Sequence, residues 1–180
     1  VCCVIATQLP GAPENEINVI GVGEVPSEGL RKGVIVNLDR TVRSIEAAVN
    51  AAERMAGHKV DSVFAGLAGQ HMRSVNSRGV VAVANNDREI TQRDVDRVIE
   101  GARTVAIPSD AEVIHVMPRG FIVDGQEGVR EAVGMSGARL EVETHIISGA
   151  TTAVQNVVKA VHAAGYNVED LVVQSLASAE

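Results

Sequence analysis

Residues 17–38 read INVIGVGEVPSEGLRKGVIVNL. The first part, Ile17 to Val25, is rich in β-branched residues and predicts a strand. The turn-forming residues of Pro26 to Gly33 end that strand, and Val34 to Val36 predicts a second, shorter one. Gly21 and Gly23 do not form a dinucleotide-binding fingerprint, because no third glycine follows at the spacing that opens a helix. We therefore attribute both glycines to the backbone geometry of a strand.

Further elements lie on either side of this stretch. Val1 to Ala6 predicts the hairpin partner of the first strand, joined to it by a turn-rich connection at residues 9–15. On the other side, Asp39 stands where a helix N-cap is expected, and Gly57 is expected to end that helix. Val60 to Leu67 then predicts another strand. The core-facing stripe expected for the helix is Val42, Ile45, Val49, Ala52 and Met55.

A second block of elements begins near Gln70. Ser74 to Ala84 predicts a strand, and Thr91 to Asp94 resembles a capping box at the start of a helix. Two more strands, at Glu112–Val123 and Arg139–Ser148, are separated by the glycine-rich stretch from Asp124 to Gly137. The stripe expected for the helix is Val95, Val98, Ile99, Ala102 and Val105.

The last part of the chain returns to a helix and a strand. The helix ends at Gly165, and Asp170 to Leu176 predicts the strand. The stripe expected for this helix is Val154, Val157, Val158 and Val161. The whole order of elements predicts an α/β organisation with mixed sheet pairing.

Composition excludes several classes of partner. The net charge of −7 and the lack of a lysine or arginine cluster argue against nucleic acid as a partner. Aromatic residues make up only 2% of the chain, so no base-stacking platform is expected. No segment approaches the ~20 apolar residues of a membrane span. We expect a soluble, cytosolic protein with an aliphatic core.

The cysteines and histidines do not indicate a metal site. Cys2 and Cys3 are adjacent in a strand-like run and point to opposite faces, so they cannot readily bridge each other or share one metal. We expect two buried or half-buried thiols in a reducing cytoplasm. The five histidines are scattered, and none pairs with cysteine or glutamate at metal-ligand spacing.

Longer motifs are specific enough to indicate a family. The stretch Ile17–Leu38 matches a family hairpin and its glycine-containing turn over many consecutive positions. Other matching motifs occur in the family's order: Ser74–Gly79, Asp87–Thr91, His115–Pro118, Asp124–Gly128, Gly134–Gly137 and Leu176–Glu180. On these residues the sequence resembles the FtsA family of bacterial cell-division proteins along nearly its whole length.

The resemblance implies an actin-like, ribonuclease H-like α/β fold. Residues 1–69 and 150–180 would form the inner subdomain of the first lobe. Residues 70–149 would form an inserted α+β interaction subdomain of strand-helix-strand-strand order. The resemblance also implies that the chain is a fragment, with further sequence expected at both ends.

The resemblance implies a cytoskeletal adaptor of cell division. Such a protein binds ATP with Mg²⁺ between two lobes, polymerises, and is at most a weak ATPase. It tethers the FtsZ ring to the inner face of the cell membrane at the division site, through a C-terminal amphipathic helix, and recruits later division proteins. The family's phosphate-binding loops and membrane helix would lie outside residues 1–180. We therefore expect the fragment alone to bind no cofactor, to show no catalysis, and to be unaffected by ATP in its melting temperature.

One residue has a candidate catalytic role. Gln174 lies where actin-like ATPases leave the last strand of this half and enter a connecting helix. In that superfamily, a glutamine or glutamate there orients the attacking water, a role that suits an amide with both donor and acceptor groups. FtsA relatives tend to carry Glu-Pro where this chain has Gln174-Ser175, which argues against a strong base. A polar residue at a strand end is the alternative interpretation.

Polar residues of the insert form the candidate interaction surface. They are expected on loops or strand ends, where recognition residues concentrate, although solvated surface is the ordinary role of any one of them. The set is Arg73, Arg78, Arg88, Asp124, Gln126, Glu127 and Arg130.

Two other functions remain open from the sequence. An actin-like scaffold of type IV pilus assembly would share the insert, but the motifs Gln126–Gly128 and Leu176–Glu180 favour the division protein. A sugar kinase on the same ATPase core would need a substrate-binding carboxylate in the cleft, and no motif supplies one.

Overall fold

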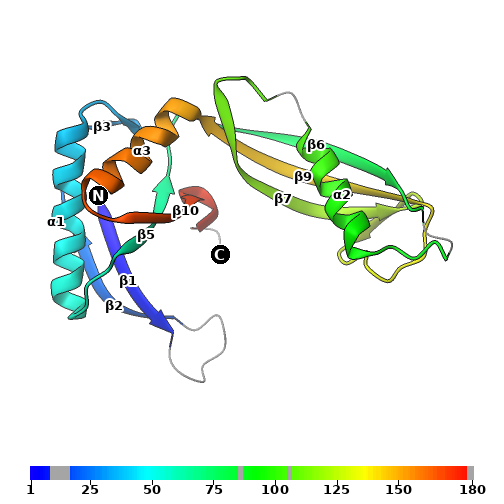
Figure 1. Ribbon diagram of the computed structural model, residues 1–180, viewed down its shortest axis with the longest axis horizontal. Helices are drawn as coiled ribbons and strands as arrows, with labels where there is room; N and C mark the ends of the chain where they lie inside the picture. Colours follow the sequence, from blue (N-terminus) through cyan, green and yellow to red (C-terminus); the bar gives the residue numbers. More distant parts are fainter. Residues whose placement is uncertain (9–16, 85–86, 105–106, 178–180) are drawn as a thin grey trace. The chain divides into compact units, whose positions relative to one another are not determined.

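The computed structural model describes residues 1–8, 17–84, 87–104 and 107–177. The chain divides into two compact units (Figure 1). Unit 1 comprises Val1–His71 and Thr151–Glu180, and unit 2 comprises Met72–Ala150. The predicted connection at residues 9–15 and the predicted core residue Val105 lie outside the described residues.

The described part of unit 1 forms three two-stranded sheets. Strands β1 (Cys2–Gln8) and β2 (Ile17–Glu24) pair antiparallel, with a bulge between Ile5 and Ala6. Strands β5 (Ser62–Leu67) and β10 (Asn167–Val173) pair parallel, so the pairing is mixed, as predicted. The third sheet is a small hairpin of β3 (Leu30–Arg31) and β4 (Val34–Ile35).

The β3–β4 hairpin corrects the sequence interpretation, which treated residues 26–33 as turn. Lys32 and Gly33 both have positive φ, at 52° and 81°. Two successive residues of positive φ form the tight turn that suits the twist of a β-hairpin. The two residues before this turn are thereby aligned with the two after it.

Helix α1 (Leu38–Ala56) begins one residue after its N-cap, Asn37. The Asn37 Oδ1 accepts a hydrogen bond of 3.0 Å from the Arg40 backbone N–H. The prediction of Asp39 as the cap is therefore wrong: Asp39 lies in the first turn, where its charge suits the positive end of the helix dipole. The predicted stop is confirmed, because Gly57 takes the left-handed conformation with φ 73°.

The buried face of α1 is made of smaller side chains than predicted. Val49 and Ala52 are buried, but Met55 is 66% exposed, so its assignment to the core is wrong. A Cβ at Gly23 would overlap the carbonyl oxygen of Ala48, and one at Gly21 would overlap that of Ala52. The two strand glycines thus let β2 approach the helix backbone closely, and this approach selects the side of α1 that carries small residues. The buried residues of this helix are Thr41, Ser44, Ala48, Val49, Ala52 and Glu53.

A buried carboxylate fixes the chain after α1. Glu53 accepts hydrogen bonds from Lys59 Nζ at 2.6 Å and from the Val60 backbone N–H at 3.0 Å. Its side chain is 4% exposed, whereas that of Lys59 is 81% exposed. The bond from Lys59, and then that from Val60, lower the pKa of Glu53. The carboxylate therefore stays charged and holds the segment that leads into β5.

Unit 1 ends with α3 (Thr151–Ala163), β10 and the short α4 (Gln174–Ala177). Val154 and Val161 are buried, as predicted, and Val157 and Val158 are half-buried. Gly165 has φ 90° just beyond the helix. Strand β10 stops at Val173, three residues before the predicted end, because the chain turns into α4 there.

In its described residues, unit 2 forms a four-stranded antiparallel sheet with one helix. The spatial order is β6 (Met72–Ala82), β9 (Arg139–Ala150), β7 (Ala111–Val123) and β8 (Gln126–Val129). Strand β8 was not predicted, because its glycine-rich surroundings favour a loop. Asp124 and Gly125 have φ 47° and 88° and form the tight turn that pairs β8 with β7.

Helix α2 (Gln92–Arg103) lies over β6 and β9 (Figure 1). Asp94 accepts hydrogen bonds from the Thr91 backbone N–H at 3.1 Å and from Thr91 Oγ1 at 2.7 Å, which lower its pKa. This confirms the predicted cap. Ile99 packs against the core from its edge. The core under the helix comprises Val83, Ile90, Val95, Val98, Ala102, Phe121, Val123, Val129, Ala132, Leu140 and Val142.

The two cysteines of β1 differ in exposure. Cys3 is half-buried, and burial raises the pKa of its thiol, but Cys2 is exposed, so the prediction of burial is wrong for Cys2. Cys2 and Cys3 are neighbours in β1, so their side chains lie on opposite faces of the strand. Within residues 1–8, 17–84, 87–104 and 107–177, no helix has the length and apolar character needed to cross a membrane.

Candidate interaction surface

The turn between β7 and β8 is fixed by Asp124. Its carboxylate accepts hydrogen bonds from the backbone N–H groups of Ala138, at 3.0 and 3.1 Å, and Arg139, at 2.8 Å. The Asp124 backbone N–H in turn donates to the Arg139 carbonyl at 3.0 Å. Asp124 therefore uses its charge within the protein, where it ties the hairpin to the start of β9. The contact role predicted for Asp124 stays a prediction.

The segment at residues 87–90 joins the same end of unit 2. Glu89 forms an isolated antiparallel bridge with Ser136, and Gly137 N–H donates to the Arg88 carbonyl at 2.8 Å. Ile90 is nearly fully buried and anchors the segment in the core. Arg88 has φ 51°, so its side chain leaves the backbone at a turn. The structure thus brings Arg88 close to residues that lie almost fifty positions away in the sequence.

Exposed polar side chains gather on this end. Gln126 and Glu127 lie on β8, and Arg130 follows it; all three are exposed. The sequence predicts these residues on loops or strand ends: Gln126 begins β8, Glu127 lies within it, and Arg130 follows it. In the described part of the chain, neither Glu127 nor Arg130 forms an ion pair within 4.0 Å. We call Arg88, Gln126, Glu127 and Arg130 the hairpin surface.

Arg78 lies in a different environment from the one predicted. It stands within β6, and its Nε lies 2.7 Å from a carboxylate oxygen of Glu141 on β9. Arg139 approaches the other oxygen of Glu141 at 3.0 Å. The Glu141 side chain is 5% exposed, so the two arginines cover a buried charge. Arg78 is therefore a structural ion-pair partner, and the sequence interpretation missed Glu141 and Arg139 because their pairing crosses strands.

The helix-free face of the sheet carries more polar groups beside this ion pair. Asn76 Oδ1 lies 2.7 Å from His145 Nδ1 on the neighbouring strand. A shallow pocket here is lined by Asn76, Ser77, Arg78, Arg119, Glu143 and Thr144. A row of paired side chains of this kind stabilises a solvated sheet face through cross-strand contacts.

Arg73 lies far from the hairpin surface. It pairs with Ser148 on β9, whereas Asp124 contacts Arg139 at the other end of that strand. Nine residues of strand separate these positions, which corresponds to roughly 30 Å at the rise of a β-strand. The seven predicted surface residues therefore do not form one patch.

Gln174 is exposed and is the first residue of α4, directly after the last residue of β10. The predicted position, where a strand leads into a helix, is thus present in unit 1. The catalytic role itself remains a proposal.

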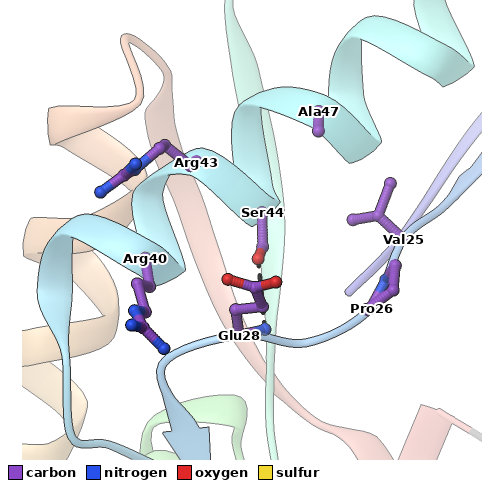
Figure 2. A pocket seen from close by; sticks show the side chains of 7 residues that line it. All are labelled: Val25, Pro26, Glu28, Arg40, Arg43, Ser44 and Ala47. Atoms are coloured by element: carbon purple, nitrogen blue, oxygen red, sulfur yellow. Dashed lines mark hydrogen bonds between the residues drawn. The ribbon is translucent and has the colours of Figure 1, made fainter.

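A pocket in unit 1 escaped the sequence interpretation (Figure 2). It lies between the segment after β2 and the first turns of α1, and it is lined by Val25, Pro26, Glu28, Arg40, Arg43, Ser44 and Ala47. Glu28 N–H donates to Ser44 Oγ at 3.2 Å, and Thr41 Oγ1 donates to the Glu28 carbonyl at 3.4 Å. Thr41 and Ser44 lie three positions apart on the buried face of α1. Two hydroxyl residues on such a face were the sequence feature that could have indicated a loop docked on the helix.

Comparison with known proteins gives consistent results for both units. Residues 69–148 match the family described as "SHS2 domain inserted in FTSA". Cell division protein FtsA of Pseudomonas aeruginosa is 46% identical over 166 residues, and that of Neisseria meningitidis is 47% identical over 167 residues. The Bacillus subtilis protein of the same name is 41% identical over 165 residues. These matches cover 92–93% of this chain but only 38–40% of each relative.

A solved structure supports the fold independently of the sequence. A chain of the PilM-PilN type IV pilus biogenesis complex aligns with a TM-score of 0.63 over 98% of this chain and 45% of that chain, at 14% identity. At this identity the likeness concerns the fold alone. It confirms the actin-like α/β class that the resemblance implied.

Proposed function

Because the chain belongs to the FtsA family of cell division proteins, we propose that it acts as a cytoskeletal adaptor of bacterial cell division. In this role the protein binds ATP, polymerises, and tethers the FtsZ ring to the inner face of the cell membrane at the division site, where it recruits later division proteins. The chain spans about two fifths of the length of its relatives, so these properties are proposed for the whole protein.

The observation that carries this proposal is the rigid hairpin surface of unit 2. Edge strand β8 is held on β7 and tied to β9 by Asp124, while Glu127 and Arg130 project without ion-pair partners among the described residues. Charges on a preorganised edge suit a contact with another protein. A head-to-tail contact joins two different surfaces and can propagate into a filament without closing.

The composition of unit 2 supports a protein partner. Residues 72–150 contain nine arginines and no lysine. Arginine is enriched and lysine depleted at protein interfaces, because the planar guanidinium binds carboxylates through paired hydrogen bonds and stacks on neighbouring groups. Unit 2 is therefore proposed as the part of the chain that contacts neighbouring subunits and division proteins.

Few of the described residues are candidates for contacting a nucleotide. The pocket in unit 1 does not fit a triphosphate, because Glu28 would repel it and the Glu28 N–H is already bonded to Ser44. Gln174, at the start of α4, is the candidate for orienting a water near a terminal phosphate in the whole protein. Bound ATP and Mg²⁺ would supply a conformational switch there.

A scaffold role in type IV pilus assembly is the second candidate, favoured by the structural likeness to the PilM-PilN complex. Sequence identity of 41–47% to division proteins, against 14% to that complex, supports the division role. Complementation of an FtsA-depleted strain by the full-length gene separates the two: restored septation supports division, and pilus rescue alone contradicts it.

A charge-reversal experiment tests the hairpin surface. We expect the full-length double variant Glu127→Arg with Arg130→Glu to form several-fold fewer filaments on lipid, with unchanged ATP affinity, because rim charges act together on association. Sedimentation and electron microscopy measure assembly, and nucleotide titration runs in parallel. The control is Glu100→Arg with Arg103→Glu, which reverses an exposed ion pair on α2. Unchanged filaments in the first variant would contradict the contact.

A further inference from the structure

The pocket in unit 1 carries charges that the protein itself does not pair. Arg40 and Arg43 extend from α1 on one side of Glu28, and Val25 and Pro26 lie on the other side (Figure 2). Among the described residues, none of these three charged side chains forms an ion pair within 4.0 Å. Two cations and one anion therefore line the pocket without an ion-pair partner, and Arg43 Nε also donates a hydrogen bond to the Asp39 carbonyl at 3.4 Å.

The pocket is preorganised by two buried hydroxyl groups. Ser44 Oγ accepts from the Glu28 N–H, and Thr41 Oγ1 donates to the Glu28 carbonyl and, at 2.9 Å, to the Asn37 carbonyl. Thr41 and Ser44 are 2% and 7% exposed. The loop carrying Glu28 is thus fixed on the helix before any ligand binds, which lowers the entropic cost of binding.

We propose that this pocket docks an acidic, aliphatic peptide segment of a partner protein. A carboxylate of the segment lies between Arg40 and Arg43, a backbone N–H donates to the Glu28 carboxylate, and an aliphatic side chain packs on Val25 and Pro26. The local excess of positive charge, in a chain of net charge −7, makes an acidic segment the electrostatically complementary ligand.

The central glutamate distinguishes a peptide from other anions. Inorganic phosphate, an anionic lipid headgroup and a nucleic-acid backbone concentrate their negative charge on neighbouring oxygens of one phosphate group, so Glu28 repels them. A peptide brings both a carboxylate and N–H donors, and it therefore satisfies all three charged side chains at once. The apolar side of the pocket gives no contact to a free phosphate.

The binding test uses the full chain and a fluorescein-labelled peptide of alternating aspartate and leucine, followed by anisotropy. We expect Arg40→Glu with Arg43→Glu to weaken binding by about tenfold or more, and binding to weaken as salt rises. The matched control, Arg54→Glu with Lys159→Glu, changes the net charge equally at exposed positions outside the pocket and leaves affinity within about twofold. An equal loss of peptide affinity in both variants would mean that only the net charge of the chain matters, and it would overturn the proposal.

A second variant separates the ligand classes. We expect Glu28→Gln to weaken peptide binding by about threefold, because a charged acceptor is replaced by a neutral one. A phosphate site would gain affinity from the same change. Competition by inorganic phosphate, or binding to anionic phosphatidylglycerol vesicles that Arg40→Glu with Arg43→Glu abolishes, would overturn the peptide in favour of those anions.

Two controls separate this site from the others. Analytical ultracentrifugation of the chain asks whether a second copy occupies the pocket: self-association lost with Arg40→Glu and Arg43→Glu, without peptide binding, contradicts a partner peptide. The variant Glu127→Arg with Arg130→Glu retains full peptide affinity, because its residues belong to unit 2. The pocket and the hairpin surface therefore succeed or fail separately.

Discussion

Units 1 and 2 bury their apolar residues in different ways. Unit 2 has one continuous sheet and a cluster in which Val98, Leu140 and Val142 are fully buried. As far as the structure describes it, unit 1 has three separate two-stranded sheets, and apolar side chains such as Phe64, at 71%, and Ile17, at 67%, are exposed. Three or more strands packed on a helix can be independently stable, whereas two-stranded sheets are marginal. Unit 2 is therefore the more self-sufficient of the two.

The two units nevertheless share one packing device. In unit 1, Gly23 on β2 lies against the backbone of α1 at Ala48, and in unit 2, Gly79 on β6 lies against the backbone of α2 at Val98. In each case a strand residue without a Cβ lets a helix approach the sheet closely. The difference between the units thus lies in the extent of the sheet around that contact.

The largest effect is expected from Val98→Asp in unit 2. This change buries an unpaired carboxylate beneath α2 and is expected to lower the free energy of unfolding by more than about 4 kcal/mol. Hydrogen exchange should show lost protection in residues 72–150, with protection retained in unit 1. The control, Val133→Asp at a 43% exposed position in the same unit, is expected to cost less than about 1 kcal/mol. Loss of protection in both units together would show that they are not independent.

A smaller effect is expected from filling the two glycine contacts. Gly79→Ala should cost about 3 kcal/mol and Gly23→Ala about 1 to 2 kcal/mol, because an added Cβ overlaps a helix carbonyl in both. The β1–β2 hairpin pairs with no further strand among the described residues, so it can move away from α1 more easily. Urea unfolding measures both, with Gly66→Ala, where no atom lies within 4 Å, as the neutral control. Equal losses of stability in Gly79→Ala and Gly23→Ala would contradict the idea that the β1–β2 hairpin moves away from its helix more easily than β6 does.

The smallest effect is expected at Glu53 in unit 1. Its pKa is lowered in the folded protein, so its contribution to stability is present above the ordinary carboxyl pKa and is lost as the pH falls through the folded value. Glu53→Gln should lower stability by about 1 to 2 kcal/mol at neutral pH, and the gap should narrow at acid pH, as the Glu53 carboxylate becomes protonated. Urea unfolding at both pH values checks this against Glu169→Gln, an exposed control. A gap that stays constant with pH would exclude the charged form as its cause.

Local chemistry made much of the fold predictable. The Thr91–Asp94 cap, the left-handed Gly57 and the apolar stripe of α2 each depend on residues within a few positions of one another. The prediction failed where neighbouring residues allowed two different local structures. Asn37, and not Asp39, caps α1. Strand β8 was not predicted, because the glycines beside it were read as part of a loop and not of a hairpin turn.

The candidate sites were less predictable, because they combine distant parts of the chain. Residue type and motif position indicated Glu127 and Arg130 as candidate contact residues. They did not show that Arg73 lies far from the hairpin surface. The pairing of Arg78 with Glu141 spans two strands. The pocket of Glu28 and Arg40 needs a loop to dock on a helix.

The sequence by itself determined the family, the order of the longer elements, the cap that begins α2 and the glycine that ends α1, because these follow from short-range backbone and side-chain chemistry. Tertiary structure alone decided which side of α1 is buried, which arginines are paired, and where unpaired charges meet in a pocket. Those outcomes depend on contacts across strands and between helix and sheet, where the close approach of Gly21 and Gly23 outweighs the size of the side chains on α1.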